Sequence, residues 1–135
     1  MMKAKLFTAT SNTSCRKAIA WLDEYDIPYE EKNLSTTPIT IEEIQEILSL
    51  TNEGTEEIIS KKAYAIKKLK IDFDALSLPQ LYKVIQDNPG VLRLPIIHDG
   101  RKLQVGYNDD EIRQFLPRWF RLDQFKQLIS LSGNI

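Results

Sequence analysis

The apolar positions at the start of the chain follow first a strand pattern, then a helix pattern, and then a strand pattern again. The short runs Ala4–Phe7 and Tyr29–Leu34 predict two strands. Between them, apolar residues recur at i, i+3, i+4 and i+7, which is one face of a helix: Ala18, Trp21, Leu22 and Tyr25. A strand, a helix and a strand within about 30 residues predict a βαβ unit with parallel strands and a right-handed crossover.

The next stretch, about residues 38–90, has the pattern of several short helices. Two capping-box patterns mark helix starts: Thr40 with Glu43, and Ser77 with Gln80. Apolar residues at helical spacing follow each of them: Ile41, Ile44 and Leu48 after the first, and Leu78, Leu81, Tyr82 and Ile85 after the second. We expect Asn52–Gly54 to end the first of these helices, with Gly54 in a left-handed cap or turn.

Strand patterns return after Asn88-Pro89-Gly90, which stops the preceding helix. Ile96–His98 and Arg101–Val105 flank Asp99-Gly100, a dipeptide that favours a tight hairpin turn. A last core helix is predicted after Asn108, which pairs with Glu111 as a cap.

The predicted order βαβ, helices, ββα is typical of a thioredoxin-like α/β fold. Its mixed sheet would carry helices on both faces, with the helical insertion between the second and third strands. The tail, residues 119–131, has apolar residues at helical spacing and predicts a surface helix. With 135 residues and no internal repeat or linker, we expect residues 1–135 to form a single domain.

Composition and charge limit the classes of function. The chain is 42% hydrophobic and 27% charged, which is ordinary for a globular protein, and no apolar run is long enough to span a membrane. Lys+Arg 18 against Asp+Glu 19 nearly cancel, so strong DNA binding through phosphate contacts alone is not expected. A single cysteine forms no internal disulfide, and without an export signal we expect a cytoplasmic protein.

The candidate chemistry lies in the turn between the first strand and the first helix. Residues Ser11–Ser14 would form this turn, with Ser14 as the N-cap and Cys15 in the first helical turn. The helix dipole and the neighbouring Arg16 and Lys17 would then help the thiol to ionise. The alternative is that Cys15 is a small buried hydrophobic residue.

The other polar candidates favour structural roles. His98, the only histidine, is expected to be exposed at a strand end and not to act as a metal ligand or a base. No cysteine–histidine spacing typical of a metal site occurs. The acidic cluster Asp109–Glu111 stands at a helix start, where it would complement the helix dipole.

Several segments resemble one known family. Residues Asn12–Ala18, followed by Trp21-Leu22, resemble the Cys-Thr-Ser-Cys redox loop of Spx-type transcription regulators, which are thioredoxin-fold relatives of the ArsC-type arsenate reductases. The resemblance to this ArsC/Spx family runs from about Leu6 to Pro117. It rests further on three segments: Asn52–Ser60, Leu94–Ile97 and Leu103–Arg118.

The resemblance also shows where this chain departs from the family. Asn12 replaces the first cysteine of the redox loop, so an internal dithiol switch is absent, and an amide is no nucleophile. The reductases hold their oxyanion with an arginine before the strand proline, where this chain has Leu94. We therefore expect no arsenate reduction. Pro95 is implied to be a structural cis-proline, and Cys15 keeps a redox role only through a mixed disulfide or sulfenic acid.

An Spx-type regulator is implied to bind the C-terminal domain of the RNA polymerase α subunit through the surface at Gly54. Lys61 and Lys62 would approach promoter DNA once polymerase has delivered the protein, or would form a solvated face. No cofactor is implied, and control by a protease adaptor stays open. Two alternatives remain: a monothiol oxidoreductase of glutaredoxin or arsenate-reductase type using Cys15, and a polymerase-binding protein that senses nothing and is controlled by its abundance.

Overall fold

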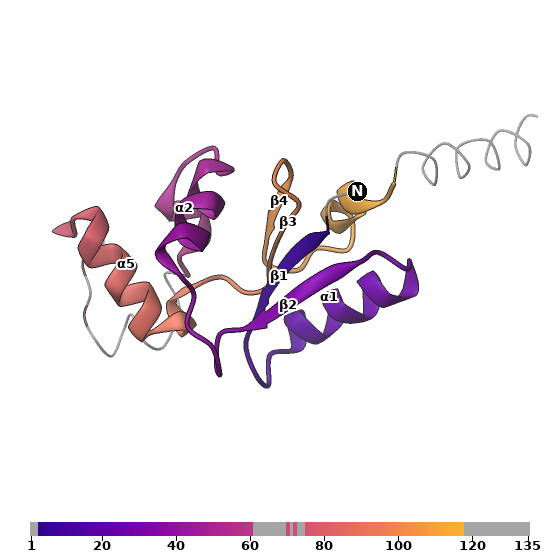
Figure 1. Ribbon diagram of the computed structural model, residues 1–135, viewed down its shortest axis with the longest axis horizontal. Coiled ribbons are helices and arrows are strands. Elements are labelled where there is room, and N and C mark those ends of the chain that lie inside the picture. The colour runs from indigo at the N-terminus through magenta and orange to yellow at the C-terminus, as the bar shows by residue number, and fades with distance from the viewer. Residues whose placement is uncertain (1–2, 61–69, 71, 73–74, 118–135) are drawn as a thin grey trace, which may run out of the picture.

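The computed structural model describes residues 3–60, 70, 72 and 75–117. A four-stranded sheet with the order β2-β1-β3-β4 lies at the centre (Figure 1). Its strands are β1 (Ala4–Thr8), β2 (Tyr29–Asn33), β3 (Ile96–His98) and β4 (Leu103–Val105). β1 and β2 run parallel, β3 runs antiparallel to β1, and β4 runs antiparallel to β3. The predicted mixed sheet of a thioredoxin-like fold is confirmed.

Helices cover both faces of this sheet. α1 (Thr13–Glu24) lies on one face, while α2 (Ile41–Ser49) and α5 (Leu78–Asp87) lie on the other (Figure 1). Successive strand residues point to opposite faces, so Leu6 packs in the core with α1 and Phe7 packs in the core with α2 and α5. The described residues therefore form two apolar cores, one on each side of the sheet.

The helical insertion between β2 and β3 begins its helices where the capping patterns predicted. Both capping boxes form, Thr40 with Glu43 at α2 and Ser77 with Gln80 at α5. The short helix α3 (Thr55–Ile58) and a 3-10 turn (η2, Pro89–Val91) complete the described part of the insertion. The predicted stop of α5 before Pro89 is confirmed.

The buried faces of α2 and α5 differ in part from the prediction. Ile41 and Leu78, the first residues of their helices, are 41% and 55% exposed. The buried residues lie further along each helix: Ile44 and Ile47 in α2, and Leu81 and Ile85 in α5. Helical spacing identified Ile44, Leu81 and Ile85 correctly, but it included the exposed first residue of each helix and missed Ile47.

The hairpin turn between β3 and β4 is longer than the sequence predicted. β4 begins at Leu103 and not at Arg101. The Asp99 carboxylate accepts hydrogen bonds from the backbone N–H groups of Arg101 and Lys102, at 3.0 and 2.8 Å. These donors are therefore used inside the turn and do not extend the strand ladder.

The last described helix is a 3-10 helix (η3, Glu111–Phe115) and not the α-helix that the pattern suggested. Its N-cap is Asp110 and not Asn108, so the predicted cap position is wrong, although Asn108 Oδ1 accepts from the backbone N–H of Glu111 at 2.9 Å. The tail helix predicted at 119–131 lies outside the described residues. Within the described ranges, no helix is long and apolar enough to cross a membrane.

Candidate functional site

The turn from β1 into α1 places Asn12 directly against Cys15. α1 begins at Thr13, and Asn12 is its N-cap, with extended backbone angles of φ −105° and ψ 116°. Its side-chain Oδ1 accepts a hydrogen bond from the backbone N–H of Cys15 at 2.9 Å. The expectation that Ser14 caps the helix is wrong, because Ser14 already lies inside it. The residue that replaces the family's first cysteine thus has a structural role of its own.

Hydrogen bonds fix the loop before Asn12 to the end of β2 and to the residues that follow it. The Thr10 backbone N–H donates to Ser35 Oγ at 3.0 Å, and Asn33 Nδ2 donates to Thr10 Oγ1 at 3.2 Å. The Leu34 N–H donates to the Thr8 carbonyl at 2.8 Å. Ser11 has a positive φ of 60°, which closes the loop. These contacts set where β1 ends and hence which residue can cap α1.

Cys15 lies in an apolar environment. It is 2% exposed and packs in the same cluster as Phe7, Leu34 and Leu94. Burial raises the pKa of the Cys15 thiol, and this outweighs the hydrogen bond from the Ala9 backbone, which lowers it. The expectation of an easily ionised thiol is therefore wrong, because desolvation disfavours the thiolate more than its neighbours favour it. The alternative, a small buried hydrophobic residue, describes this environment better.

The residue before the strand proline belongs to the same cluster. The Leu94–Pro95 peptide bond is cis, the isomer that the resemblance implied. Leu94, which stands where an oxyanion-binding arginine would be needed, is buried with the Cys15 cluster. Arg93, one residue earlier, is exposed and its Nη1 donates to the Glu57 carbonyl of α3 at 3.2 Å. Neither position brings a cation to the thiol.

The Gly54 turn forms a second candidate site between α2 and α3. Gly54 has φ 80° and ψ −138°, a conformation that strongly favours glycine, and apart from Gly54 and its two chain neighbours no atom lies within 4 Å of the position that a Cβ would take. It precedes α3 and does not end α2, whose C-cap is Leu50. The N–H groups of Asn52 and Glu53 donate to Glu57 Oε1, each at 2.9 Å. The turn at Gly54 is therefore fixed by hydrogen bonds and left open where a side chain would stand.

Lys61 and Lys62, the residues expected near DNA, lie outside the described part of the chain. Among the described residues, no group of three or more His, Cys, Asp and Glu side chains is arranged to hold a metal ion.

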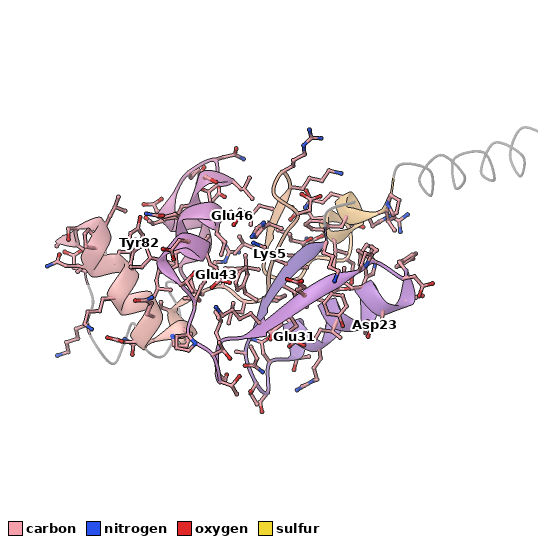
Figure 2. The ribbon with its side chains drawn as sticks, in the orientation of Figure 1. Lys5, Asp23, Glu31, Glu43, Glu46 and Tyr82 are labelled. Atoms are coloured by element: carbon pink, nitrogen blue, oxygen red, sulfur yellow. The ribbon has the colours of Figure 1, made fainter. Side chains whose placement is uncertain are left out.

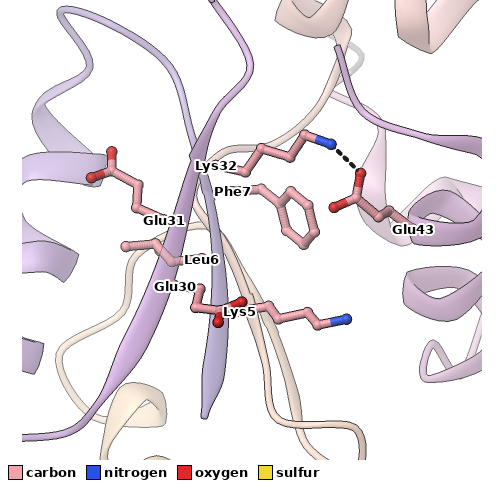
Figure 3. A pocket seen from close by; sticks show the side chains of 7 residues that line it. All are labelled: Lys5, Leu6, Phe7, Glu30, Glu31, Lys32 and Glu43. Atoms are coloured by element: carbon pink, nitrogen blue, oxygen red, sulfur yellow. Dashed lines mark hydrogen bonds and ion pairs between the residues drawn. The ribbon is translucent and has the colours of Figure 1, made fainter. Parts of the chain in front are cut away.

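The structure also shows a polar layer between α2 and the sheet, which sequence reasoning missed. Lys5, Phe7 and Lys32 point toward α2, and Lys32 is paired with Glu43, beside a cavity of about 300 Å³ (Figure 3). Lys5 Nζ lies 3.4 Å from Glu46 Oε2, and Figure 2 shows both residues between the sheet and α2.

His98 lies in the same layer and is 1% exposed, so its expected exposure is wrong. β3 lies between β1 and β4, and its register places His98 opposite both Lys5 and Leu103. His98 therefore has a neighbouring strand on each side although it is the last residue of its own strand. The only sequence signal for this was the uninterrupted apolar character of the residues before His98.

Comparison with known proteins places this geometry in context. Residues 7–115 match the ArsC family. The global transcriptional regulator Spx of Staphylococcus saprophyticus is 57% identical over 122 residues, which is 90% of this chain and 93% of that protein. The global transcriptional regulator Spx of Listeria innocua is 55% identical over 122 residues, with the same shares covered.

Solved structures share the fold at much lower identity. An ArsC-family-related protein from Bacteroides fragilis superimposes with a TM-score of 0.72 at 20% identity, over 84% of this chain and 98% of that one. An arsenate reductase from Vibrio cholerae gives a TM-score of 0.66 at 18% identity, over 85% of this chain and 96% of that one. These likenesses concern the fold alone.

Proposed function

This chain belongs to the ArsC family, and we propose that within it the chain is an Spx-type global transcriptional regulator and not an enzyme. The observation that carries this proposal is the 57% identity to an Spx regulator over 90% of the chain. The site supports it, because Asn12 offers no nucleophile and Cys15 is buried beside Leu94. The same features argue against the alternative of a monothiol oxidoreductase, which needs an accessible thiolate.

The regulator is proposed to act in the cytoplasm by binding the C-terminal domain of the RNA polymerase α subunit at the Gly54 turn. A glycine whose backbone is open on one side allows a partner to come close to the main chain. The chain has 18 basic against 19 acidic residues, so phosphate contacts alone would hold it weakly on DNA. A polymerase subunit would bring it to promoters.

Binding of the purified α C-terminal domain to Gly54→Arg protein tests this proposal. A long charged side chain at a close backbone contact is left unpaired at the interface, which costs about 2–5 kcal/mol. Since about 1.4 kcal/mol is tenfold in affinity, we expect at least about tenfold weaker binding. Unchanged affinity of the folded variant would remove the polymerase contact from this turn.

Two control variants separate the contact from backbone strain. Gly54→Ala introduces the strain of the positive φ, about 1–3 kcal/mol, without a charge, and a melting curve measures that cost. Gly90→Arg adds the same side chain at an exposed glycine that also has open space around its Cβ position. Gly90→Arg should bind the α domain like the unchanged protein.

Lys61 and Lys62 are proposed to contact promoter DNA within the polymerase complex. Replacing both with Glu should reduce promoter binding of the assembled complex while leaving the affinity for the isolated α domain unchanged. Loss of both activities together would instead indicate a folding defect or a shared surface.

We further propose that the regulator has no disulfide switch, because its single cysteine is buried. Its activity would then follow its abundance more than the redox state of the cell.

A further inference from the structure

His98 occupies a position where a proton would change the contacts between the sheet and α2. Its ring stacks on Phe7, with centroids 6.1 Å apart and planes 19° apart. The Gly100 backbone N–H donates to His98 Nδ1 at 3.2 Å. In the neutral ring Nδ1 is therefore the acceptor, and the proton resides on Nε2. Nε2 is buried and finds no partner among the described residues.

The second group near Nδ1 is a carboxylate on α2. Glu46 Oε1 lies 3.8 Å from Nδ1, while Glu46 Oε2 accepts from Lys5 Nζ at 3.4 Å. A proton added to His98 must bind at Nδ1, because Nε2 already carries one. The Gly100 N–H then loses its acceptor, and the charged ring competes with Lys5 Nζ for the carboxylate of Glu46.

We propose that His98 is a proton-operated latch beneath α2: the neutral ring leaves α2 packed on the sheet, and the protonated ring loosens that packing. The neutral state satisfies Gly100 and leaves the Lys5–Glu46 pair intact. The protonated state places a charge on a ring stacked against Phe7 and leaves the Gly100 donor without an acceptor. Opening of α2 lets water solvate the charged ring and the unpaired Gly100 N–H, which relieves the cost of burying each of them.

The charged groups around the ring have opposing effects on the pKa of His98. Burial lowers the pKa of His98, and Lys5 on β1 acts in the same direction. Glu46 and Glu43 on α2 and Asp99 in the hairpin turn raise the pKa, but by less than burial lowers it. The unfolded chain therefore takes up the proton first, near pH 6.5. The stability contributed by neutral His98 is complete above that pH and is lost as the pH falls below it.

The latch acts on the turn to which we assigned polymerase binding. Thr51 Oγ1 donates to the Leu48 carbonyl at the end of α2 and accepts from the Gly54 N–H at 3.1 Å. Movement of α2 therefore changes the support of Gly54. If the Gly54 turn binds the α C-terminal domain, as proposed above, then acid weakens that binding.

Nitrogen NMR of the imidazole tests the latch directly, because the chain has one histidine. We expect the Nε2–H tautomer and a titration midpoint below 6.5, the ordinary value. Glu46→Gln removes the negative charge and should lower the midpoint further, whereas Lys5→Met should raise it. A midpoint at or above 6.5, an Nδ1–H tautomer, or no shift in either variant would overturn the proposal.

Amide hydrogen exchange at pH 7.5 and pH 5.5, corrected for intrinsic rates, tests the movement. Protection of α2 should fall at least about threefold more than protection of α1, and His98→Phe, which keeps a stacked ring, should abolish the difference. Equal changes in both helices would refute the latch. These measurements need no polymerase, so failure of the Gly54 proposal and failure of the latch are distinguishable.

Discussion

Replacing Asn12 with alanine should destabilise the protein, while replacing Ser14 with alanine should not. Asn12 Oδ1 accepts the backbone N–H of Cys15 at 2.9 Å and is the N-cap contact of α1. Ser14 is the second residue of the helix. Local sequence preference alone does not decide between the two residues, since serine is as good a cap as asparagine.

The magnitude follows from the environment of the orphaned N–H group. Loss of an N-cap side chain costs about 1 kcal/mol, within a range of about 0.5–2. Cys15 is 2% exposed, so water replaces the lost acceptor poorly, and an unsatisfied buried donor costs about 1–3 kcal/mol. We therefore expect about 1.5 kcal/mol, which is about tenfold in the folding equilibrium.

Urea unfolding at pH 7.5, followed by circular dichroism, measures this loss of stability. The melting temperature should fall by about 4–8 °C. Asn12→Asp serves as a matched control, because it keeps the acceptor and adds a negative charge at a helix N-terminus, worth about 0.3–1 kcal/mol. It should be at least as stable as the unchanged protein. Ser14→Ala should change stability by less than about 0.5 kcal/mol.

A larger loss in Ser14→Ala than in Asn12→Ala would refute this reasoning, because α1 would then begin after Ser14. A loss in Asn12→Asp equal to that in Asn12→Ala would show that the amide donor, and not the Oδ1 acceptor, stabilises the turn.

Three further predictions concern catalysis, oxidation and acid stability. With glutathione and glutaredoxin supplied, arsenate-dependent consumption of reductant should stay at background, because Asn12 is no nucleophile and Leu94 carries no charge. Arsenate turnover that is abolished by Cys15→Ser would contradict this. Mild peroxide with glutathione should give only one glutathione adduct or a linked dimer at Cys15, as measured by intact mass. The reaction should be slower than that of a free thiol, because burial raises the pKa of the Cys15 thiol. Modification at the rate of a free thiol would show that the sulfur is accessible. Burial raises the pKa of Glu43, but hydrogen bonds from Lys32 and the Thr40 cap together lower it below 4.5. The stability contributed by ionised Glu43 is present above pH 4.5 and is lost as the pH falls through the pKa of Glu43 in the folded protein. The stability difference between the unchanged protein and Lys32→Met should therefore shrink from pH 7 to pH 3. A constant difference would exclude an ionic contribution.

The sequence by itself determined the elements whose signals are local. A capping box satisfies donors within one helical turn, so Thr40 with Glu43 and Ser77 with Gln80 were readable without any tertiary information. The period of the apolar residues likewise predicted the order of strands and helices. The replacement of a nucleophilic cysteine by Asn12 was visible directly.

Tertiary structure decided the features that depend on residues distant in the chain. Ser35 and Asn33, which bind Thr10, help to set the end of β1 and so the capping of α1 by Asn12. The Cys15 environment is apolar because Leu34 and Leu94 arrive from other segments.

His98 shows the same dependence most strongly. Its burial follows from the position of β3 inside the sheet and from the helix packed over it, and the apolar residues before His98 do not by themselves specify either. Helical and strand periods report which side of an element is apolar. Desolvation depends on what covers that side, and therefore the pKa values of Cys15 and His98 were decided only when the chain was folded.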